Sequence, residues 1–411
     1  MFPEAHMLAP SLPLSAYRAD RAQYPQRARL TRSDEDLVKL SVLLNRCLQV
    51  RRRDDGDEKL AQLRRQCHAL GLRILAQEDR VLDDVGDGVD APAPETVRML
   101  REVADAAEDG GALRLADTLM LLTYREFGVE AGVLERGRVL AQRARIARKL
   151  GDREAAEALY DEVRAWGGGL PEMQARADIG NAMLARERGN IPAMRTHFTS
   201  ALENARACGS NELIAKAHHG MMLAAAAAKH FDEALLHAWA AFRDIRGDTV
   251  REGEALLNLA QAAFDLGHPD VALHMFAIAL SHALPNRLEL PALGGAALAA
   301  ASIGDGETLR RIARRTEHVS RGDDLTYDAV AALAEIAKAY ALIDDPDAET
   351  RRLAVLATAT RAGFHEIVFG LELVRPKTAE RRSTALASDP VRQVLEDADA
   401  LGNWEELVAN I

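Results

Sequence analysis

Six short turn-like breaks recur at a nearly constant interval, and this interval restricts the fold more than any other feature of the chain. The breaks are the pairs Gly110-Gly111, Gly151-Asp152, Gly189-Asn190, Lys229-His230, Gly267-His268 and Gly304-Asp305. Counted from positions 111, 151, 189, 229, 267 and 304, the spacings are 40, 38, 40, 38 and 37 residues. No intervening stretch alternates apolar and polar residues with period two, so helices are expected between the breaks. A fixed period in this range is typical of stacked helical hairpins.

Small and large side chains keep phase with these breaks. Seven residues before each break stand Ala104, Ala144, Ala182, Met222, Ala260 and Ala297. Nine residues after each break stand Met120, Tyr160, Phe198, Ala238, Phe276 and Ala313. Two helices approach to about 8–10 Å only where small residues face each other. We therefore expect the alanines to lie inside each hairpin and the aromatic residues to fill the gap to the next hairpin.

The residues at the breaks suit the end of one helix and the start of the next. Glycine readily adopts the left-handed conformation that ends a helix. Asp152 and Asn190 are expected to cap the helix that follows, and Pro192 and Pro269 fall in a first turn, where proline is tolerated.

The segments 151–160 (GDREAAEALY) and 267–276 (GHPDVALHMF) resemble the second half of the tetratricopeptide repeat (TPR). The family's usual repeat has 34 residues, and the excess here is about one helical turn. Repeats of this length look like those of bacterial signalling regulators. The early tryptophan of the family is absent, and Lys229 stands where other breaks have glycine. The resemblance covers about residues 94–320 and implies an all-α fold, a right-handed α-solenoid of antiparallel helical hairpins.

The organisation of the chain follows from this register. Residues 1–33 are rich in proline and arginine and are expected to be a poorly ordered tail. Residues 34–82 should form a helical hairpin, and 83–95, rich in Gly, Asp and Pro, a linker. The TPR-like array should span 96–325. Residues 326–411 should add further helical repeats and a cap that hides the last apolar face.

The resemblance also predicts which residues line the inner face of the array. Family geometry places the inward positions of a repeat 13, 10, 6, 3 and 2 residues before the break. In three consecutive repeats these positions include Arg138, Arg145, Arg148, Lys149, Arg176, Ile179, Met183, Arg186, Lys216, His219 and Leu223. They form a basic groove with an apolar floor in a protein of net charge −11. Because arginine grips carboxylates in bidentate fashion, one hypothesis is a groove for an acidic peptide or protein tail. The alternative is an ordinary solvated face.

No residue pattern indicates catalysis, a cofactor or a metal. The chain lacks the motifs of metalloproteases, phosphate-binding loops, dinucleotide folds and serine hydrolases. A metal site between His218-His219 and the pair His230 and His237 is conceivable in principle, but packing histidines are the favoured interpretation. Three scattered cysteines fit reduced thiols in a cytoplasmic protein. No stretch is long and apolar enough to span a membrane. A protein that is not an enzyme and has no cofactor is expected.

Two functions therefore remain open. The first is a scaffold that binds a protein or peptide in its concave groove. The second is the sensor arm of a bacterial transcription or signalling regulator. The acidic balance argues against nucleic-acid binding, and only the run Arg51-Arg52-Arg53 favours it. Scattered apolar positions are compatible with a homodimer without requiring one.

Overall fold

A computed structural model describes residues 32–53, 57–77, 93–109, 112–245, 249–282, 284, 286–320, 326–372, 388–401 and 407–408. The regular elements in these ranges are helices, and no strand occurs in them. Residues 1–31 of the predicted tail, 83–92 of the predicted linker and the break Gly110-Gly111 lie outside the described ranges. The helical structure already includes residues 32–33 and 93–95, so both neighbouring helices begin earlier than expected.

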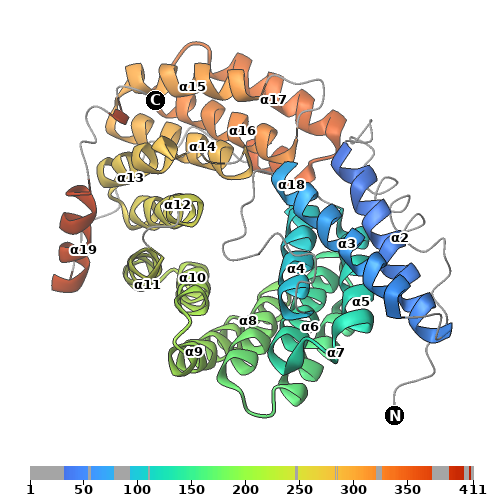
Figure 1. Cartoon of the computed structure of the whole chain (residues 1–411). Helices are drawn as coiled ribbons and strands as arrows, with labels where there is room; N and C mark the ends of the chain where they lie inside the picture. Colours follow the sequence, from blue (N-terminus) through green and yellow to red (C-terminus); the bar gives the residue numbers. More distant parts are fainter. Residues whose placement is uncertain are drawn as a thin grey trace. The chain divides into compact units, whose positions relative to one another are not determined.

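From α4 to α18 the helices follow one another with short connections (Figure 1). Their bounds are α2 (Arg32–Arg53), α3 (Asp57–Gln77), α4 (Ala93–Asp109), α5 (Leu113–Phe127), α6 (Gly132–Lys149), α7 (Arg153–Trp166), α8 (Pro171–Glu187), α9 (Ile191–Cys208), α10 (Asn211–Ala227), α11 (Phe231–Asp244), α12 (Thr249–Leu266), α13 (Pro269–Ser281), α14 (Asn286–Ile303), α15 (Gly306–Val319), α16 (Tyr327–Leu342), α17 (Ala348–Ala362), α18 (His365–Glu372) and α19 (Asp389–Asp399). From α4 to α17 each even-numbered helix packs against the next odd-numbered one, and we call these the first and second helix of a hairpin.

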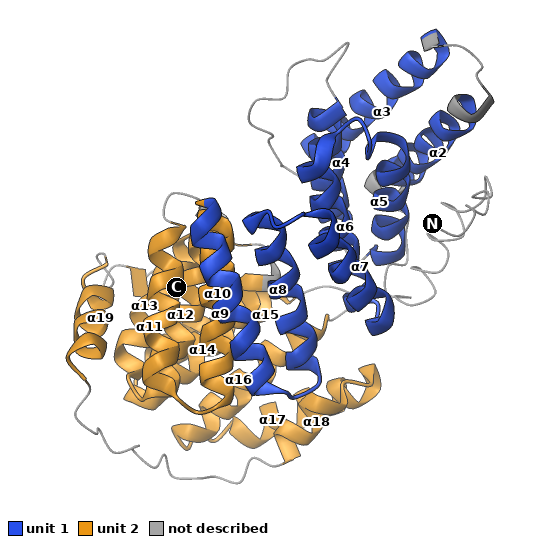
Figure 2. Ribbon diagram, turned by 90° about the horizontal axis from the view of Figure 1, so that it is seen from below, with its two compact units in different colours: residues 1–208 blue, residues 209–411 orange. Residues whose placement is uncertain are grey.

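The chain divides into two compact units, residues 1–208 and 209–411 (Figure 2). In unit 1 the first helices contact one another in the order α4, α6, α8. In unit 2 the first helices α12, α14 and α16 do the same. Successive second helices make no contacts of comparable extent in the described part of either unit. The first helices are therefore the closer-packed layer, as expected for the inner side of a helical-repeat solenoid.

The breaks adopt the expected left-handed backbone. Gly151 has φ 82° and Gly267 has φ 100°. Lys229 takes the same conformation with φ 61°, although a side chain with Cβ rarely adopts it. A further break of this kind occurs at Asp344, with φ 53°, which is 40 residues after Gly304. The repeat register thus holds at Lys229, where the sequence departs from the family, and continues into the last hairpin.

Capping side chains begin the following helices. The Asp152 carboxylate accepts a hydrogen bond from the Ala155 N–H at 3.0 Å, and the Asn190 side chain accepts one from the Ala193 N–H at 3.1 Å. These contacts satisfy amide groups that have no partner within the helix. The predicted caps are confirmed, and Pro269 is the first residue of α13, as expected.

The aromatic residues nine positions after a break bridge successive hairpins. The ring of Tyr160 in α7 lies against Gly180 of α8, and the ring of Phe276 in α13 lies against Gly295 of α14. A Cβ atom at either glycine would overlap the ring. Tyr160 is 3% exposed and Phe276 is 1% exposed. The prediction that these rings fill the gap to the next hairpin is confirmed. The alanines seven residues before the breaks are also fully buried.

The last helices pack in two places. The short helix α18 contacts α16 and α17. Helix α19 lies against α11 and α13, where its apolar residues Val391 and Val394 join the main core of unit 2. His274 Nδ1 of α13 lies 2.5 Å from Asp399 Oδ1 of α19. The described C-terminal residues thus form helices and short turns, and α19 covers second helices of earlier hairpins.

Gly295→Ala tests the contact between ring and glycine. The added methyl group would press on the Phe276 ring, so the substitution should lower the free energy of unfolding by roughly 1–3 kcal/mol. The matched control is Gly370→Ala in α18, because nothing lies within 4 Å of a Cβ built there. The control should leave stability unchanged or raise it slightly, since alanine favours helix. Thermal unfolding followed by circular dichroism measures both, and equal effects would contradict the packing described.

Candidate functional site

The residues predicted to line the inner face lie on three first helices. Helix α6 carries Arg138, Arg145, Arg148 and Lys149, α8 carries Arg176, Ile179, Met183 and Arg186, and α10 carries Lys216, His219 and Leu223. Helices α6 and α8 belong to unit 1 and α10 belongs to unit 2. The two parts are therefore described separately.

Carboxylates of α4 pair with the cations at the end of α6. Arg145 binds Asp105 and also donates to Glu108 from Nη2 at 2.8 Å. The ammonium group of Lys149 lies 2.6 Å from the Glu108 carboxylate. Burial disfavours a charged Arg145, but the carboxylates of Asp105 and Glu108 outweigh it and raise the pKa of its guanidinium above the ordinary value. Arg145 is therefore held as a cation between two anions.

A second set of ion pairs joins α6 to α8. Arg138 grips the carboxylate of Glu172 with two hydrogen bonds of 2.7 and 2.8 Å. Arg176 donates to the same carboxylate at 2.9 Å. Burial alone would raise the pKa of Glu172, but the two arginines prevail and lower it. Arg148 lies 2.6 Å from Glu187 at the end of α8. We call these contacts, from Asp105 and Glu108 to Glu172 and Glu187, the ion-pair ladder of unit 1.

The ladder changes the charge expected of this face. Each of Arg138, Arg145, Arg148, Lys149 and Arg176 faces at least one carboxylate of a first helix. The face is consequently one of mixed charge, in contrast to the basic groove that the arginine positions suggest. The binding role of these residues stays a prediction.

The carboxylates that the prediction of a basic groove overlooked could have been found from the sequence. The offsets 6 and 3 residues before a break, applied to the break at 111, give Asp105 and Glu108. The same offsets before the break at 151 give Arg145 and Arg148. Residues at equivalent positions of neighbouring repeats lie side by side in a regular array, so opposite charges there pair across the repeats. The inner face has to be considered over all repeats together.

The remaining predicted residues of unit 1 are less enclosed. Ile179 and Met183 on α8 are half-buried, and Arg186 is exposed near the end of the helix. They lie on the same helix as Arg176, one turn or more further along. An apolar strip flanked by a ladder of charges therefore runs along α8.

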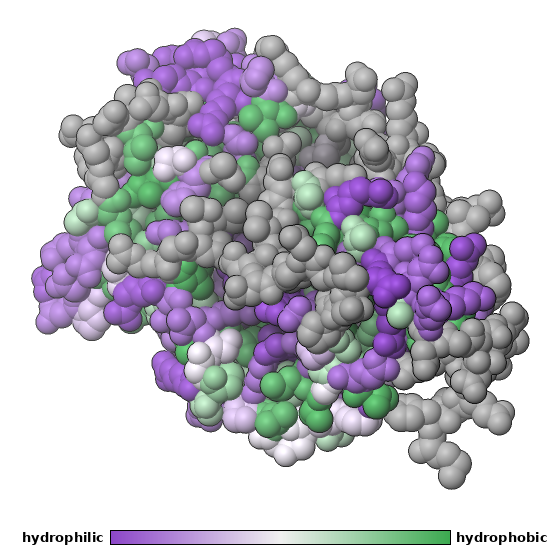
Figure 3. Space-filling view, in the orientation of Figure 1, coloured by the Kyte–Doolittle hydropathy of each residue, from purple (hydrophilic) through white to green (hydrophobic). Residues whose placement is uncertain are grey.

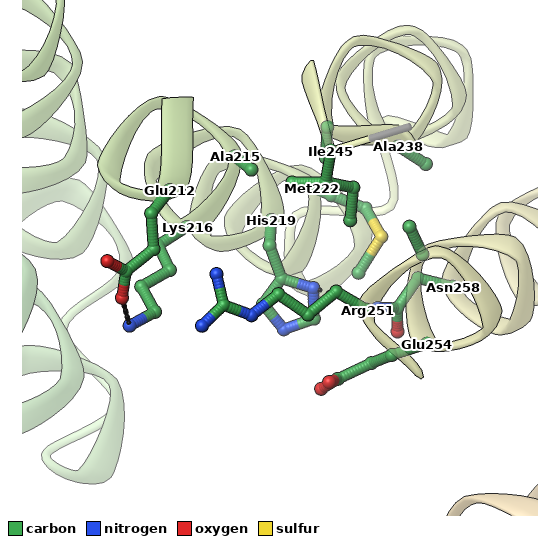
Figure 4. Close-up of a pocket in the computed structure, with 12 residues that line it drawn as sticks. Glu212, Ala215, Lys216, His219, Met222, Ala238, Ile245, Arg251, Glu254 and Asn258 are labelled. Carbon is green, nitrogen blue, oxygen red and sulfur yellow. Dashed lines mark hydrogen bonds and ion pairs between the residues drawn. The ribbon is translucent and has the colours of Figure 1, made fainter. Parts of the chain in front are cut away.

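In unit 2 the predicted residues of α10 border a pocket of about 160 Å³ between α10, α11 and α12 (Figure 4). Lys216 pairs with Glu212 one turn earlier at 2.5 Å. His219 accepts a hydrogen bond at Nδ1 from the side-chain amide of Asn258 on α12, at 3.1 Å. Leu223 is half-buried against the core. Two of the three predicted residues thus line a cavity.

The histidines flagged in the sequence form a pair. Nδ1 of His218 on α10 and Nδ1 of His237 on α11 are 3.0 Å apart. One ring must donate and the other accept, so the two share a single proton at this contact. No group of three or more potential metal ligands comes together among the described residues. Cys47 and Cys67 are buried thiols and Cys208 is half-buried, all without a disulfide.

Polar contacts also join helices elsewhere: Asp178 of α8 accepts hydrogen bonds from Arg164 of α7 and from Ser200 of α9. Figure 3 shows hydrophilic side chains gathered over α15 and α19 on the face in view. On α15, Arg311 pairs with Glu307 one turn earlier and Arg315 pairs with Glu289. The side chains of the Arg51-Arg52-Arg53 run lie outside the described residues. No helix in the described ranges is long and apolar enough to cross a membrane.

Comparison with known proteins shows a likeness of fold. No protein-family model matches the chain, and no curated protein matches it. Among solved structures, the chain is similar to a signal transduction ATPase with numerous domains (STAND) that has a tetratricopeptide repeat sensor, from Pyrococcus horikoshii. The TM-score is 0.50 at 12% sequence identity, over 89% of this chain and 56% of that protein. The chain thus spans just over half the length of that protein, and the fold is an all-α solenoid of the TPR-like type.

The ion-pair ladder predicts acid sensitivity through Glu172. Because its folded pKa lies below the ordinary 4.5, its contribution is complete above about pH 4.5 and is lost as the pH falls through the folded value. Glu172→Gln should lower the thermal midpoint at pH 7, and the difference from wild type should shrink as the pH falls below about 4.5. Glu203→Gln, at an exposed site on α9, is the control. A difference for Glu172→Gln that stays constant from pH 7 to pH 3 would contradict the ladder.

Proposed function

We propose that the protein is a non-enzymatic helical-repeat scaffold that binds a protein or peptide along the first-helix face of its repeats. The observation that carries this proposal is the ion-pair ladder of unit 1, because it fixes charged side chains of α4, α6 and α8 in one arrangement. A surface fixed in this way loses little conformational entropy when a partner binds.

The ladder still offers cations to a partner. The side chains of Arg145 and Lys149 remain 36% and 40% exposed. The hydrogen bonds of Arg145 to Asp105 and Glu108 use Nε and Nη2. A guanidinium group carries five N–H donors, so Nη1 can reach a further carboxylate. Arg186 adds an exposed cation on α8. Acidic side chains of a partner can therefore extend the ladder outward, next to Ile179 and Met183.

The similar protein from Pyrococcus horikoshii supports the same class of function. Its repeats are described as a sensor within a signalling ATPase. This favours, as a second candidate, a sensor or regulatory role for the present chain in a bacterial signalling or transcription pathway. In both cases the repeats would act through binding in the cytoplasm, and the candidates differ in what the bound partner controls.

Charge reversal on the inner face is the direct test. The Arg145→Glu change is unsuitable, because it would place a third carboxylate beside Asp105 and Glu108 and disturb the fold. Arg186→Glu avoids this problem. Arg206→Glu on α9 is the matched control, since it reverses an exposed charge on the second helix of the same hairpin. The immobilised full chain is used to capture partners from lysate of the native cell, with identification by mass spectrometry.

Wild type and Arg206→Glu should recover the same protein partner, and Arg186→Glu should bind it roughly three- to tenfold more weakly. Higher salt should weaken the binding, because the contacts are between exposed charges. Equal binding by both variants would contradict the use of this face. Recovery of a signalling or transcription complex would favour the regulatory role, and recovery of specific DNA without protein would overturn the scaffold.

A further inference from the structure

The repeat of unit 2 that follows the break at Lys229 lacks the ring that bridges hairpins at Tyr160 and Phe276. Tyr160 and Phe276 occupy the position nine residues after a break, and Ala238 occupies the equivalent position in α11. The receiving glycines, Gly180 and Gly295, stand nine residues before the next break. The residue at that position opposite Ala238 is Asn258. Both the ring and its glycine seat are therefore replaced at this interface.

A cavity occupies the place of the missing ring. The pocket of about 160 Å³ between α10, α11 and α12 is lined by Ala238 and Asn258 themselves (Figure 4). Its other apolar walls are Ala215, Ala241, Met222, Ile245 and Ala255. An apolar cavity of about this size is sufficient to hold an aromatic ring. The apolar character of these walls matches what a ring requires.

A second repeat without a ring shows that the loss of the ring does not by itself leave a cavity. Ala313 stands at the same position in α15. There α14 and α16 pack directly on each other, and a Cβ built on Gly294 would lie 3.4 Å from Cα of Ala332. The first helices α10 and α12 make no contact of that extent among the described residues. The helices close the gap at Ala313, whereas at Ala238 they leave it open.

We propose that this cavity is the seat for an aromatic side chain supplied by the bound polypeptide. The inference rests on the proposed scaffold function and specifies one residue of the partner. The chain itself shows the preferred occupant, because Tyr160 and Phe276 fill the equivalent gaps. Met222, which stands where most repeats have alanine, has a flexible side chain that can move to admit the ring.

The charged residues at the mouth of the pocket balance, so this rim favours an uncharged side chain that is recognised by its shape. Lys216 and Arg251 are cations, and Glu212 and Glu254 are carboxylates, so the charges at the mouth balance. The hydrogen-bonded pair of Asn258 and His219 gives one polar edge. This edge accommodates a peptide group or a tyrosine hydroxyl beside the ring. The ladder of unit 1 would thus contribute ion pairs to the free energy of binding. This pocket would contribute the burial of apolar surface.

The test is a binding measurement with defined probes on the full chain. The protein is labelled with ¹³C at its methionine methyl groups, and the Met222 signal is identified by its loss in Met222→Leu. The probes are acetyl-Ala-Phe-Ala-amide, acetyl-Ala-Ala-Ala-amide and toluene. The double variant Ala238→Phe with Asn258→Gly restores the ring and its glycine seat. Ala238→Leu partly fills the cavity and serves if the double variant does not fold, as judged by circular dichroism.

The phenylalanine peptide should shift the Met222 signal of wild type, and the alanine peptide should not. In the filled variants its dissociation constant should rise at least about tenfold, as expected from excluding a buried ring. No shift in wild type, or equal binding by the filled variants, would overturn the proposal. Binding of toluene without the peptide would also overturn it, in favour of a small aromatic ligand. If the filled variants still capture the partner at full strength, the pocket proposal is wrong while the scaffold stands.

Discussion

The seating of an aromatic ring against a backbone without Cβ is the contact on which the rest of the structure depends. Tyr160 on Gly180 and Phe276 on Gly295 set the distance between one hairpin and the next. Alanines set the distance within each hairpin, and they are buried because two helices meet there. In a solenoid each repeat touches only its neighbours, so these two ring contacts determine how the hairpins on either side of them stack.

The ring contact acts together with the turns that precede it. A left-handed glycine at 151 and at 267 ends the first helix of its hairpin, and Tyr160 and Phe276 follow nine residues later. The turn therefore places the ring in register with the next hairpin. This explains why Lys229 adopts φ 61° without glycine, since the register requires that conformation from whatever residue stands there. The same register brings equivalent positions of successive first helices side by side, which produces the pairing of Arg145 with Asp105 and Glu108.

The fold could be predicted from the sequence because the features that indicate it are local and recur in each repeat. Break residues, caps such as Asp152 and the burial of the in-phase alanines all follow from spacing along one chain. The charge of the inner face was harder to predict, since the partners of Arg145 and Arg138 come from neighbouring repeats, 37 and 34 residues away. The pocket could not be predicted at all, because the absence of a ring has two outcomes. Whether α14 and α16 close together, or α10 and α12 stay apart, depends on packing over several helices.

The protein is thus a regular array of helical hairpins. The repeat that departs from the pattern contains the proposed binding pocket between α10, α11 and α12. The most direct test of this account is a crystal structure under xenon pressure, because xenon enters apolar cavities of this size. The account predicts a xenon atom beside Met222, Ala238 and Ala255, with no xenon between α7 and α8, where Tyr160 fills the gap. Direct contact between α10 and α12 with no xenon beside Ala238 would contradict it.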